Sequence, residues 1–115
     1  MHEMGIALEI IDIAAASIPA DLAGVQVKTV NLKVGKLAAI VPESLRFCFT
    51  VATKNGPLDG AELVIEEIPV RARCEHCRHE WHVEGPAFRC PQCDAGRITL
   101  LSGRELNIES IEIID

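Results

Sequence analysis

Apolar residues recur every three or four positions in two segments, a pattern that predicts two amphipathic helices. The first helix is expected from about residue 3 to 17, ending before Pro19. Its expected buried stripe consists of Met4, Leu8, Ile11 and Ala15, widened by Ile6, Ile10 and Ile13. The second helix begins at Pro42, a residue suited to the first helical position, and ends at 55–57. Its apolar stripe consists of Leu45, Cys48, Phe49 and Ala52.

Alternating apolar and polar residues predict three strands, at 28–34, 61–68 and 105–114. The alternation of the third slips near Ser110, which is typical of a bulge or kink. Because a last strand cannot stand alone, we expect it to return and pair with both of the others. The residues expected to face the core are Val30, Leu32, Val34, Leu63 and Ile65.

The order of these elements predicts an α+β fold in which two helices cover one face of a three-stranded sheet. A cysteine-rich segment at 71–103 separates the last two strands and is expected to form an inserted, zinc-ribbon-like domain. The other domain then comprises residues 1–70, completed by the C-terminal strand 104–115. We expect the junctions between the two domains to lie at Arg71-Ala72-Arg73 and Leu101-Ser102-Gly103.

Composition and charge narrow the class of protein. The chain has 115 residues, a net charge of −6 and only 3% aromatic residues, so its core must be mainly aliphatic. No apolar run approaches the roughly eighteen residues of a membrane span. No basic region precedes the apolar stretch at 6–20, which argues against a secretory signal. We therefore expect a cytoplasmic protein with no membrane partner.

Two Cys-x-x-Cys pairs separated by twelve residues form the strongest chemical signal. This spacing is typical of four thiolates around one tetrahedral ion, and it predicts one structural Zn(II) per chain. The expected ligands are Cys74, Cys77, Cys90 and Cys93. In a reducing compartment such pairs favour a metal over disulfides, although iron held by four thiolates is an alternative. The few apolar residues of this segment cannot fold it alone, so the metal is expected to supply the missing free energy.

Residues around the cysteine pairs qualify this interpretation. A glycine often follows the second cysteine of such loops because it tolerates positive φ, whereas Arg78 and Asp94 stand there in this chain. Three histidines, His76, His79 and His82, surround the first pair and are expected to be solvated loop residues. The alternative is that His79 tunes or replaces a zinc ligand as pH or a partner changes.

The chain begins Met1-His2-Glu3, which gathers an amine, an imidazole and a carboxylate within three residues. The α-amine of Met1, the amide nitrogen of His2 and its Nδ1 can form fused chelate rings on one ion. Glu3 would add a backbone nitrogen or a carboxylate. Planar nitrogen donors suit Ni(II) or Cu(II) better than zinc or magnesium. The alternative is that His2 is an ordinary exposed side chain.

These features together resemble the HypA/HybF family, the nickel metallochaperones of nickel–iron hydrogenase maturation. The resemblance runs essentially end to end. Besides Met1-His2-Glu3 and the late cysteine segment, it includes Val34-Gly35-Lys36-Leu37, Val41-Pro42-Glu43-Ser44-Leu45-Arg46-Phe47, Arg71-Ala72-Arg73-Cys74, Phe88-Arg89-Cys90-Pro91 and Ser102-Gly103-Arg104-Glu105-Leu106. It implies a nickel site at His2 and Glu3 and a zinc site at the four cysteines.

The function that the resemblance implies is delivery of Ni(II). The protein would dock on a nickel-binding GTPase of the same pathway and help insert the ion into the large subunit of hydrogenase, or into urease in some organisms. Ligand exchange needs no covalent catalysis, so we expect a non-enzyme, and a monomer or weak homodimer. One alternative is a zinc-ribbon module that binds nucleic acid or protein. The net charge of −6 and the lack of an aromatic platform oppose nucleic-acid binding. The second alternative is a thiol-redox or iron electron-transfer protein.

Overall fold

The computed structural model describes residues 2–85 and 87–114, and the chain forms two compact units. The helical unit comprises Met1–Lys33, Ala39–Glu66 and Asn107–Asp115. The cysteine unit comprises Val34–Ala38 and Glu67–Leu106. The domain boundaries proposed from the sequence remain a prediction. No helix in the described ranges is both long enough and apolar enough to cross a bilayer.

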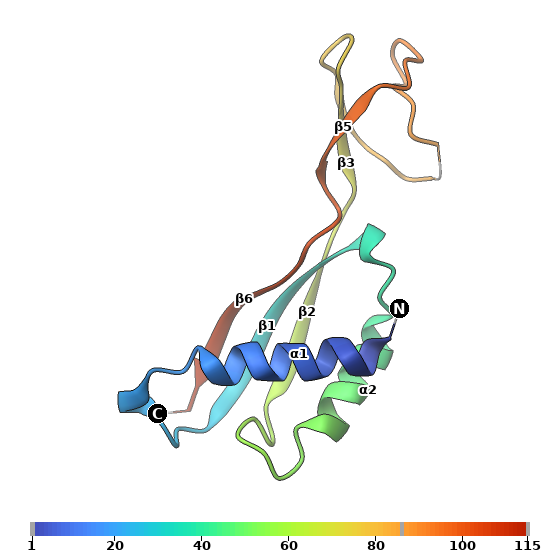
Figure 1. Cartoon of the computed structure of the whole chain (residues 1–115). Coiled ribbons are helices and arrows are strands. Elements are labelled where there is room, and N and C mark those ends of the chain that lie inside the picture. Colours follow the sequence, from blue (N-terminus) through green and yellow to red (C-terminus); the bar gives the residue numbers. More distant parts are fainter. Residues whose placement is uncertain (1, 86, 115) are drawn as a thin grey trace. The chain divides into compact units, whose positions relative to one another are not determined.

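Both expected helices form, as α1 (Glu3–Ala16) and α2 (Pro42–Ala52) (Figure 1). Pro42 occupies the first turn of α2, where its missing N–H costs no helical hydrogen bond. Leu45 and Phe49 of α2 are completely buried, as their spacing predicted. Two short 3₁₀ helices, η1 (Ala20–Leu22) and η2 (Lys36–Ala38), were not expected.

The buried stripe of α1 differs in part from the expected one, of which Ile10 is buried as predicted. The residues that it buries are Ala7, Ile10 and Ala14, whereas Leu8 is 50% exposed and Met4 39%. The helix is apolar on nearly all sides, so the spacing of its apolar residues does not select one face. Two alanines on the buried side allow a close approach of the helix to its neighbours, and packing of the helical unit thereby selects the face.

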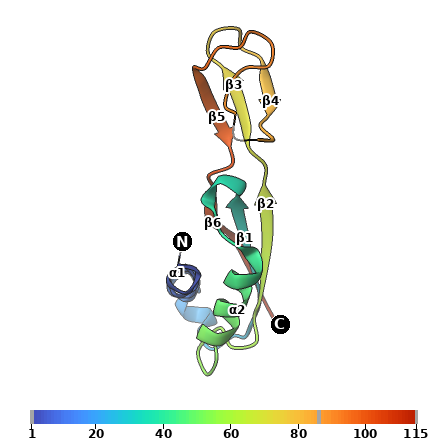
Figure 2. The same ribbon diagram turned by 90° about the vertical axis from the view of Figure 1, so that its right-hand side faces the viewer.

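Three strands form the sheet of the helical unit, in the order β2 (Glu62–Ile68), β1 (Val27–Gly35), β6 (Leu106–Ile113). In Figure 1, β1 and β2 run in the same direction and α2 lies between them in the chain. Parallel neighbours require such a crossover connection. Both helices lie on one face of the sheet (Figure 2). Val30, Leu32 and Leu63 are buried, as expected for the inward face.

The C-terminal strand β6 returns antiparallel to β1. Lys33 Nζ lies 3.6 Å from Glu109 Oε1, and the N–H of Ile114 donates to the carbonyl of Gln26. The expectation that this strand pairs with both others was wrong, because β1 lies between β6 and β2. The most continuously buried strand thus takes the centre, where both of its backbone edges are paired.

The cysteine unit contains a second sheet that the sequence did not reveal, in the order β4 (Glu80–His82), β3 (Arg71–Cys74), β5 (Ile98–Ser102). All of its pairings are antiparallel, with Ala72 opposite both Trp81 and Leu100. Most residues of the two expected junctions therefore belong to strands β3 and β5. These strands are short, and their apolar and polar residues alternate little. They are therefore recognised by their backbone pairing and not by a pattern of side chains.

A close backbone contact ties the 34–38 segment into the cysteine unit. The N–H of Gly35 donates to the carbonyl of Glu105 at 2.7 Å, and the N–H of Leu37 donates to that of Gly103 at 2.8 Å. A Cβ on Gly35 would lie 2.1 Å from the carbonyl carbon and oxygen of Gly103. Only glycine permits this approach.

Candidate metal centres

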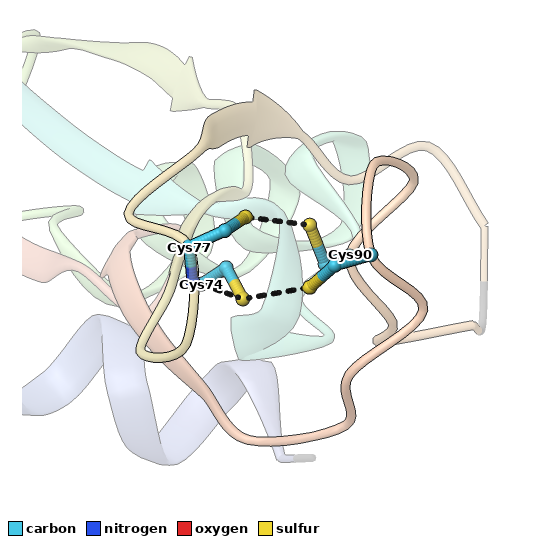
Figure 3. A group of neighbouring side chains, drawn as sticks. Cys74, Cys77 and Cys90 are labelled. Atoms are coloured by element: carbon cyan, nitrogen blue, oxygen red, sulfur yellow. Dashed lines mark hydrogen bonds between the residues drawn. The ribbon is translucent and has the colours of Figure 1, made fainter.

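The four cysteines converge at one end of the cysteine unit, although they come from two loops. Cys74 ends β3, and Cys77 follows in the turn after it. Their sulfurs and those of Cys90 and Cys93 all lie within 4.8 Å of one another. Cys74 Sγ lies 3.5 Å from Cys93 Sγ, and Cys77 Sγ lies 3.5 Å from Cys90 Sγ (Figure 3). The structure thus groups all four cysteines for a metal site, and all four are free of disulfides.

This sulfur geometry fits a tetrahedral metal–thiolate centre. With metal–sulfur bonds of about 2.3 Å, sulfurs at the corners of a tetrahedron lie roughly 3.8 Å apart. Two observed separations are slightly shorter and none of the set exceeds 4.8 Å. Small adjustments of the side chains would therefore accommodate one such ion. Cys74 and Cys90 are buried, whereas Cys77 and Cys93 are exposed, so one side of the group faces solvent.

The two Cys-x-x-Cys pairs lie in separate loops that have the same backbone conformation. In the first loop, the N–H of Arg78 donates to the carbonyl of Cys74 at 2.9 Å. In the second, the N–H of Asp94 donates to the carbonyl of Cys90 at 2.8 Å. Both donors have positive φ, 68° for Arg78 and 60° for Asp94. Arg78 and Asp94 therefore adopt the left-handed backbone conformation at the positions where glycine is often found.

Backbone N–H groups in these loops point at sulfur. The N–H groups of His76 and Cys77 lie 3.3 and 3.4 Å from Cys74 Sγ, and that of Gln92 lies 3.4 Å from Cys90 Sγ. Such donors stabilise a thiolate relative to a thiol. The N–H of Cys77, followed by that of His76, lowers the pKa of Cys74 to about 6 against opposing desolvation. The loop backbone thus supports a negative sulfur before any side chain contributes.

The four thiols cannot all ionise without a compensating cation. The N–H of Ala95 acts to lower the pKa of Cys93, but desolvation and the three neighbouring sulfurs outweigh it and raise that pKa to about 12. A divalent ion removes this repulsion and allows every sulfur to become a ligand. The donor set is therefore suited to a closed metal site with four sulfur ligands.

The histidines of the segment do not join the sulfur group. Among the described residues, the only set of three or more metal-ligating side chains close enough to share an ion is that of the four cysteines. The ring of His79 instead stacks on Trp81, with centroids 5.9 Å apart and planes inclined by 6°. The His79 imidazole is therefore not part of the sulfur group, although the His79 carbonyl accepts the N–H of Cys74 at 2.8 Å. The hypothesis that His79 tunes the site remains a prediction.

His2 precedes the first turn of α1, with an extended backbone (φ −90°, ψ 96°). Its carbonyl accepts the N–H of Ile6 at 3.2 Å, while its side chain is exposed and caps no helical N–H. The imidazole is accordingly open to an ion from solution. Met1, whose α-amine the sequence suggested as a further ligand, lies outside the described residues.

Glu3 is the first residue of α1, and its side chain contacts the start of α2. Its Oε2 accepts the N–H of Val41, the residue preceding Pro42, at 3.3 Å. This hydrogen bond is the largest cause of a lowered Glu3 pKa, and the N–H of Glu3 itself adds to it. Sequence reasoning missed this contact, because the two residues are 38 positions apart and nothing between them signals that the two helices begin side by side.

The sequence as a whole matches the family described as "Hydrogenase/urease nickel incorporation, metallochaperone, hypA", over residues 1–113. The chain belongs to the HypA family. Two relatives, both named hydrogenase maturation factor HypA, illustrate the similarity. The one from Desulfosudis oleivorans is 58% identical over 113 residues, covering 98% of each chain. The one from Streptomyces avermitilis is 49% identical, covering 96% of this chain and 86% of its own.

Solved HypA structures share the fold at much lower identity. The solution structure of the Ni metallochaperone HypA from Helicobacter pylori aligns with a TM-score of 0.67 at 19% identity, over 99% of this chain and 98% of that one. A second HypA solution structure aligns with a TM-score of 0.73 at 19% identity, over 99% and 97% of the two chains. The expected α+β fold and the expected family are thus both confirmed.

Proposed function

We propose that this protein binds Ni(II) at its N-terminus and delivers it during maturation of nickel–iron hydrogenase, with a structural Zn(II) at the four cysteines. The observation that carries the proposal is the family match over residues 1–113, since that family is one of nickel-incorporating metallochaperones. The exposed imidazole of His2 supports it, because an ion held there can reach a second protein without the chain unfolding.

The proposed nickel ligands are the α-amine of Met1, the amide nitrogen and imidazole of His2, and Glu3. Such nitrogen donors favour a planar Ni(II) complex. Delivery then proceeds by ligand exchange, in which donors of the acceptor replace those of the N-terminus one at a time. No bond in a substrate is broken, so the protein acts as a binding protein and not as an enzyme.

The proposed zinc ligands are Cys74, Cys77, Cys90 and Cys93. Zinc would hold both loops of the cysteine unit together and take no part in transfer, because four sulfurs leave it no open position. One ion per chain satisfies the site. The loop backbone supports this role through the N–H groups that face sulfur.

The proposed partners are a nickel-binding GTPase of the maturation pathway and the large subunit of hydrogenase, or urease in some organisms. We propose that these encounters take place in the cytoplasm, with the protein as a monomer or weak homodimer. Neither nucleic acid nor membrane is a proposed partner. The net charge of −6 supports the exclusion of nucleic acid, since phosphates would be repelled.

Nickel titration of untagged protein tests the nickel site. We expect His2→Ala to abolish specific Ni(II) binding, measured by calorimetry, while zinc content measured by elemental analysis stays unchanged. Acidification should weaken nickel binding in the native protein, because the amine must be unprotonated and the imidazole neutral. A matched control is His82→Ala, which removes an imidazole from the cysteine unit. Full nickel affinity in His2→Ala would contradict the proposal.

A further inference from the structure

Strand β5 has a free backbone edge in the cysteine unit. It pairs only with β3, and the described residues form no strand beyond it (Figure 2). The N–H of Glu75 donates to the carbonyl of Arg97 at 3.0 Å, immediately before β5. Because backbone groups alternate between the two edges of an antiparallel strand, Thr99 also faces β3. Ile98 and Leu100 then turn their N–H and C=O groups toward the free edge.

This edge lacks the protection that exposed edges usually carry. Natural edge strands are commonly guarded by lysine, proline, inward-pointing charges or a covering segment. Residues 98–102, Ile-Thr-Leu-Leu-Ser, contain no charged residue and no proline. The opposite edge of the same sheet, β4, carries Glu80 and His82 within its three residues. An unguarded edge of this kind is a template for pairing with another extended chain.

A cavity of about 490 Å³ lies beside β5, entirely within the cysteine unit. Its lining residues are Leu37, Phe88, Ile98, Leu100 and Arg104. A second cavity of about 320 Å³ shares Leu100 and Arg104 with it and continues along the strand. Leu37 is 40% exposed and Phe88 36%, so these walls include exposed apolar surface.

Arg104 provides the only charge in the lining of the larger cavity. Across residues 2–85 and 87–114, its guanidinium has neither a hydrogen bond nor an ion pair. Arg104 is exposed, and its guanidinium next to the apolar lining is able to form a charge-assisted hydrogen bond with a carboxylate. A ligand that fits both the apolar lining and Arg104 would therefore have an anionic group next to an apolar group.

We propose that the free edge of β5 binds an extended acidic–apolar segment of a partner protein. The segment would add as a fourth strand through the backbone groups of Ile98 and Leu100, insert an apolar side chain into the larger cavity and place a carboxylate on Arg104. This is strand addition, in which backbone bonds supply affinity and side-chain pockets supply specificity. A second copy of this chain is disfavoured, because residues 98–102, the strand that it would offer to this edge, contain no carboxylate for Arg104.

This site is independent of nickel binding, because it involves neither the N-terminus nor α1. The test therefore uses zinc-loaded, nickel-free protein and a phage-displayed library of random nine-residue peptides. We expect enrichment of peptides with an Asp or Glu one or two positions from a large apolar residue. A synthetic copy of an enriched peptide should shift the NMR signals of the Leu37, Ile98 and Leu100 methyl groups. It should also slow amide exchange at Ile98 and Leu100.

Paired substitutions on the two sides of the contact complete the test. Arg104→Gln should weaken the peptide about tenfold, the loss typical of one charge-assisted hydrogen bond. A peptide in which the acid is replaced by the matching amide should bind the native protein with the same loss of affinity. This second measurement keeps the test valid if Arg104→Gln folds poorly. The control Arg46→Gln changes an exposed arginine of α2 and should leave affinity unchanged. Undiminished binding of the amide peptide, shifts confined to other residues, or concentration-dependent pairing of β5 with a second copy would each overturn the proposal.

Discussion

Two residues in the metal-binding loops adopt a conformation that their side chains disfavour. Arg78 and Asp94 have φ values of 68° and 60° at equivalent places after the second cysteine of each pair. An L-residue with a Cβ loses roughly 1 kcal/mol in this region, although aspartate tolerates it better than arginine does. The chain accepts this cost because the turn directs the N–H of Arg78 to the carbonyl of Cys74 and keeps the cysteines in place.

Replacing Arg78 with glycine should therefore stabilise the cysteine unit. We expect Arg78→Gly to raise its free energy of unfolding by about 0.5–1 kcal/mol, the relief of strain less the added flexibility of the unfolded chain. Denaturant unfolding of zinc-loaded protein, followed by fluorescence of Trp81 within β4, measures this. Asp94→Gly is the comparison, and we expect it to gain less because it also loses the 3.2 Å contact with Arg89. A destabilised Arg78→Gly would show that the side chain has another stabilising role.

Gly35 is the position at which a single methyl group should do the most damage. The Cβ of an alanine would lie 2.1 Å from backbone atoms of Gly103, and backbone cannot move aside as a flexible side chain can. We expect Gly35→Ala to lower the free energy of unfolding by about 1–3 kcal/mol or more. The control is Gly96→Ala, because no atom lies within 4 Å of its added Cβ. Equal unfolding midpoints for the two variants would contradict the close approach.

At the scale of elements, the Glu3 carboxylate connects the starts of α1 and α2. It accepts a hydrogen bond from Val41, at the positive end of α2, where a negative charge is favoured. The N–H of Val41, with that of Glu3, lowers the pKa of this carboxyl below its ordinary value. A depressed pKa in the folded state means that the contact contributes stability above the ordinary pKa and loses it as pH falls through the lowered one.

The chemical shift of the Val41 amide should accordingly titrate in acid. We expect it to stay constant near neutrality and to move as pH falls below the ordinary range of a glutamate. Glu3→Gln should remove this titration while keeping an oxygen that can accept the bond. Glu9→Gln, on an exposed part of the same helix, should leave it intact. If the Val41 amide titrates identically in Glu3→Gln, another group causes the shift.

At the scale of the whole molecule, the two proposed metal sites should be separable. The cysteine group lies in one unit and His2 lies in the other. Because metal binding and folding of a small metal-dependent unit are one process, Cys74→Ser should release zinc and change Trp81 fluorescence to that of an unfolded segment. Helical circular dichroism should remain, since α1 and α2 belong to the helical unit.

Metal contents provide the measurement. Elemental analysis of Cys74→Ser should show less than one zinc per chain, while nickel titration should show the native nickel stoichiometry. Cys48→Ser is the control, because Cys48 lies on α2 and outside the sulfur group. Loss of helical signal along with zinc would contradict the independence of the two units.

Much of this protein could be predicted from local pattern. Both helices and the three strands of the larger sheet lie close to their expected positions, because each is long enough to repeat its periodicity. Proline placed the start of α2, since it tolerates only the first turn of a helix. The convergence of the four cysteines also followed from their spacing, because Cys-x-x-Cys closes a loop of nearly fixed geometry.

The tertiary structure decided those features for which the local sequence pattern allowed more than one arrangement. Apolar residues lie on nearly all sides of α1, so the sequence did not distinguish the predicted side with Met4 and Leu8 from the side with Ala7 and Ala14 that packing buries. The second sheet, the order of strands, the contact from Glu3 to Val41 and the free edge of β5 were likewise invisible in the sequence. Each depends on segments far apart in the chain meeting in space. A local pattern records which residues prefer burial or extension, but only competition among all segments for the same core and the same backbone partners determines which neighbour each receives.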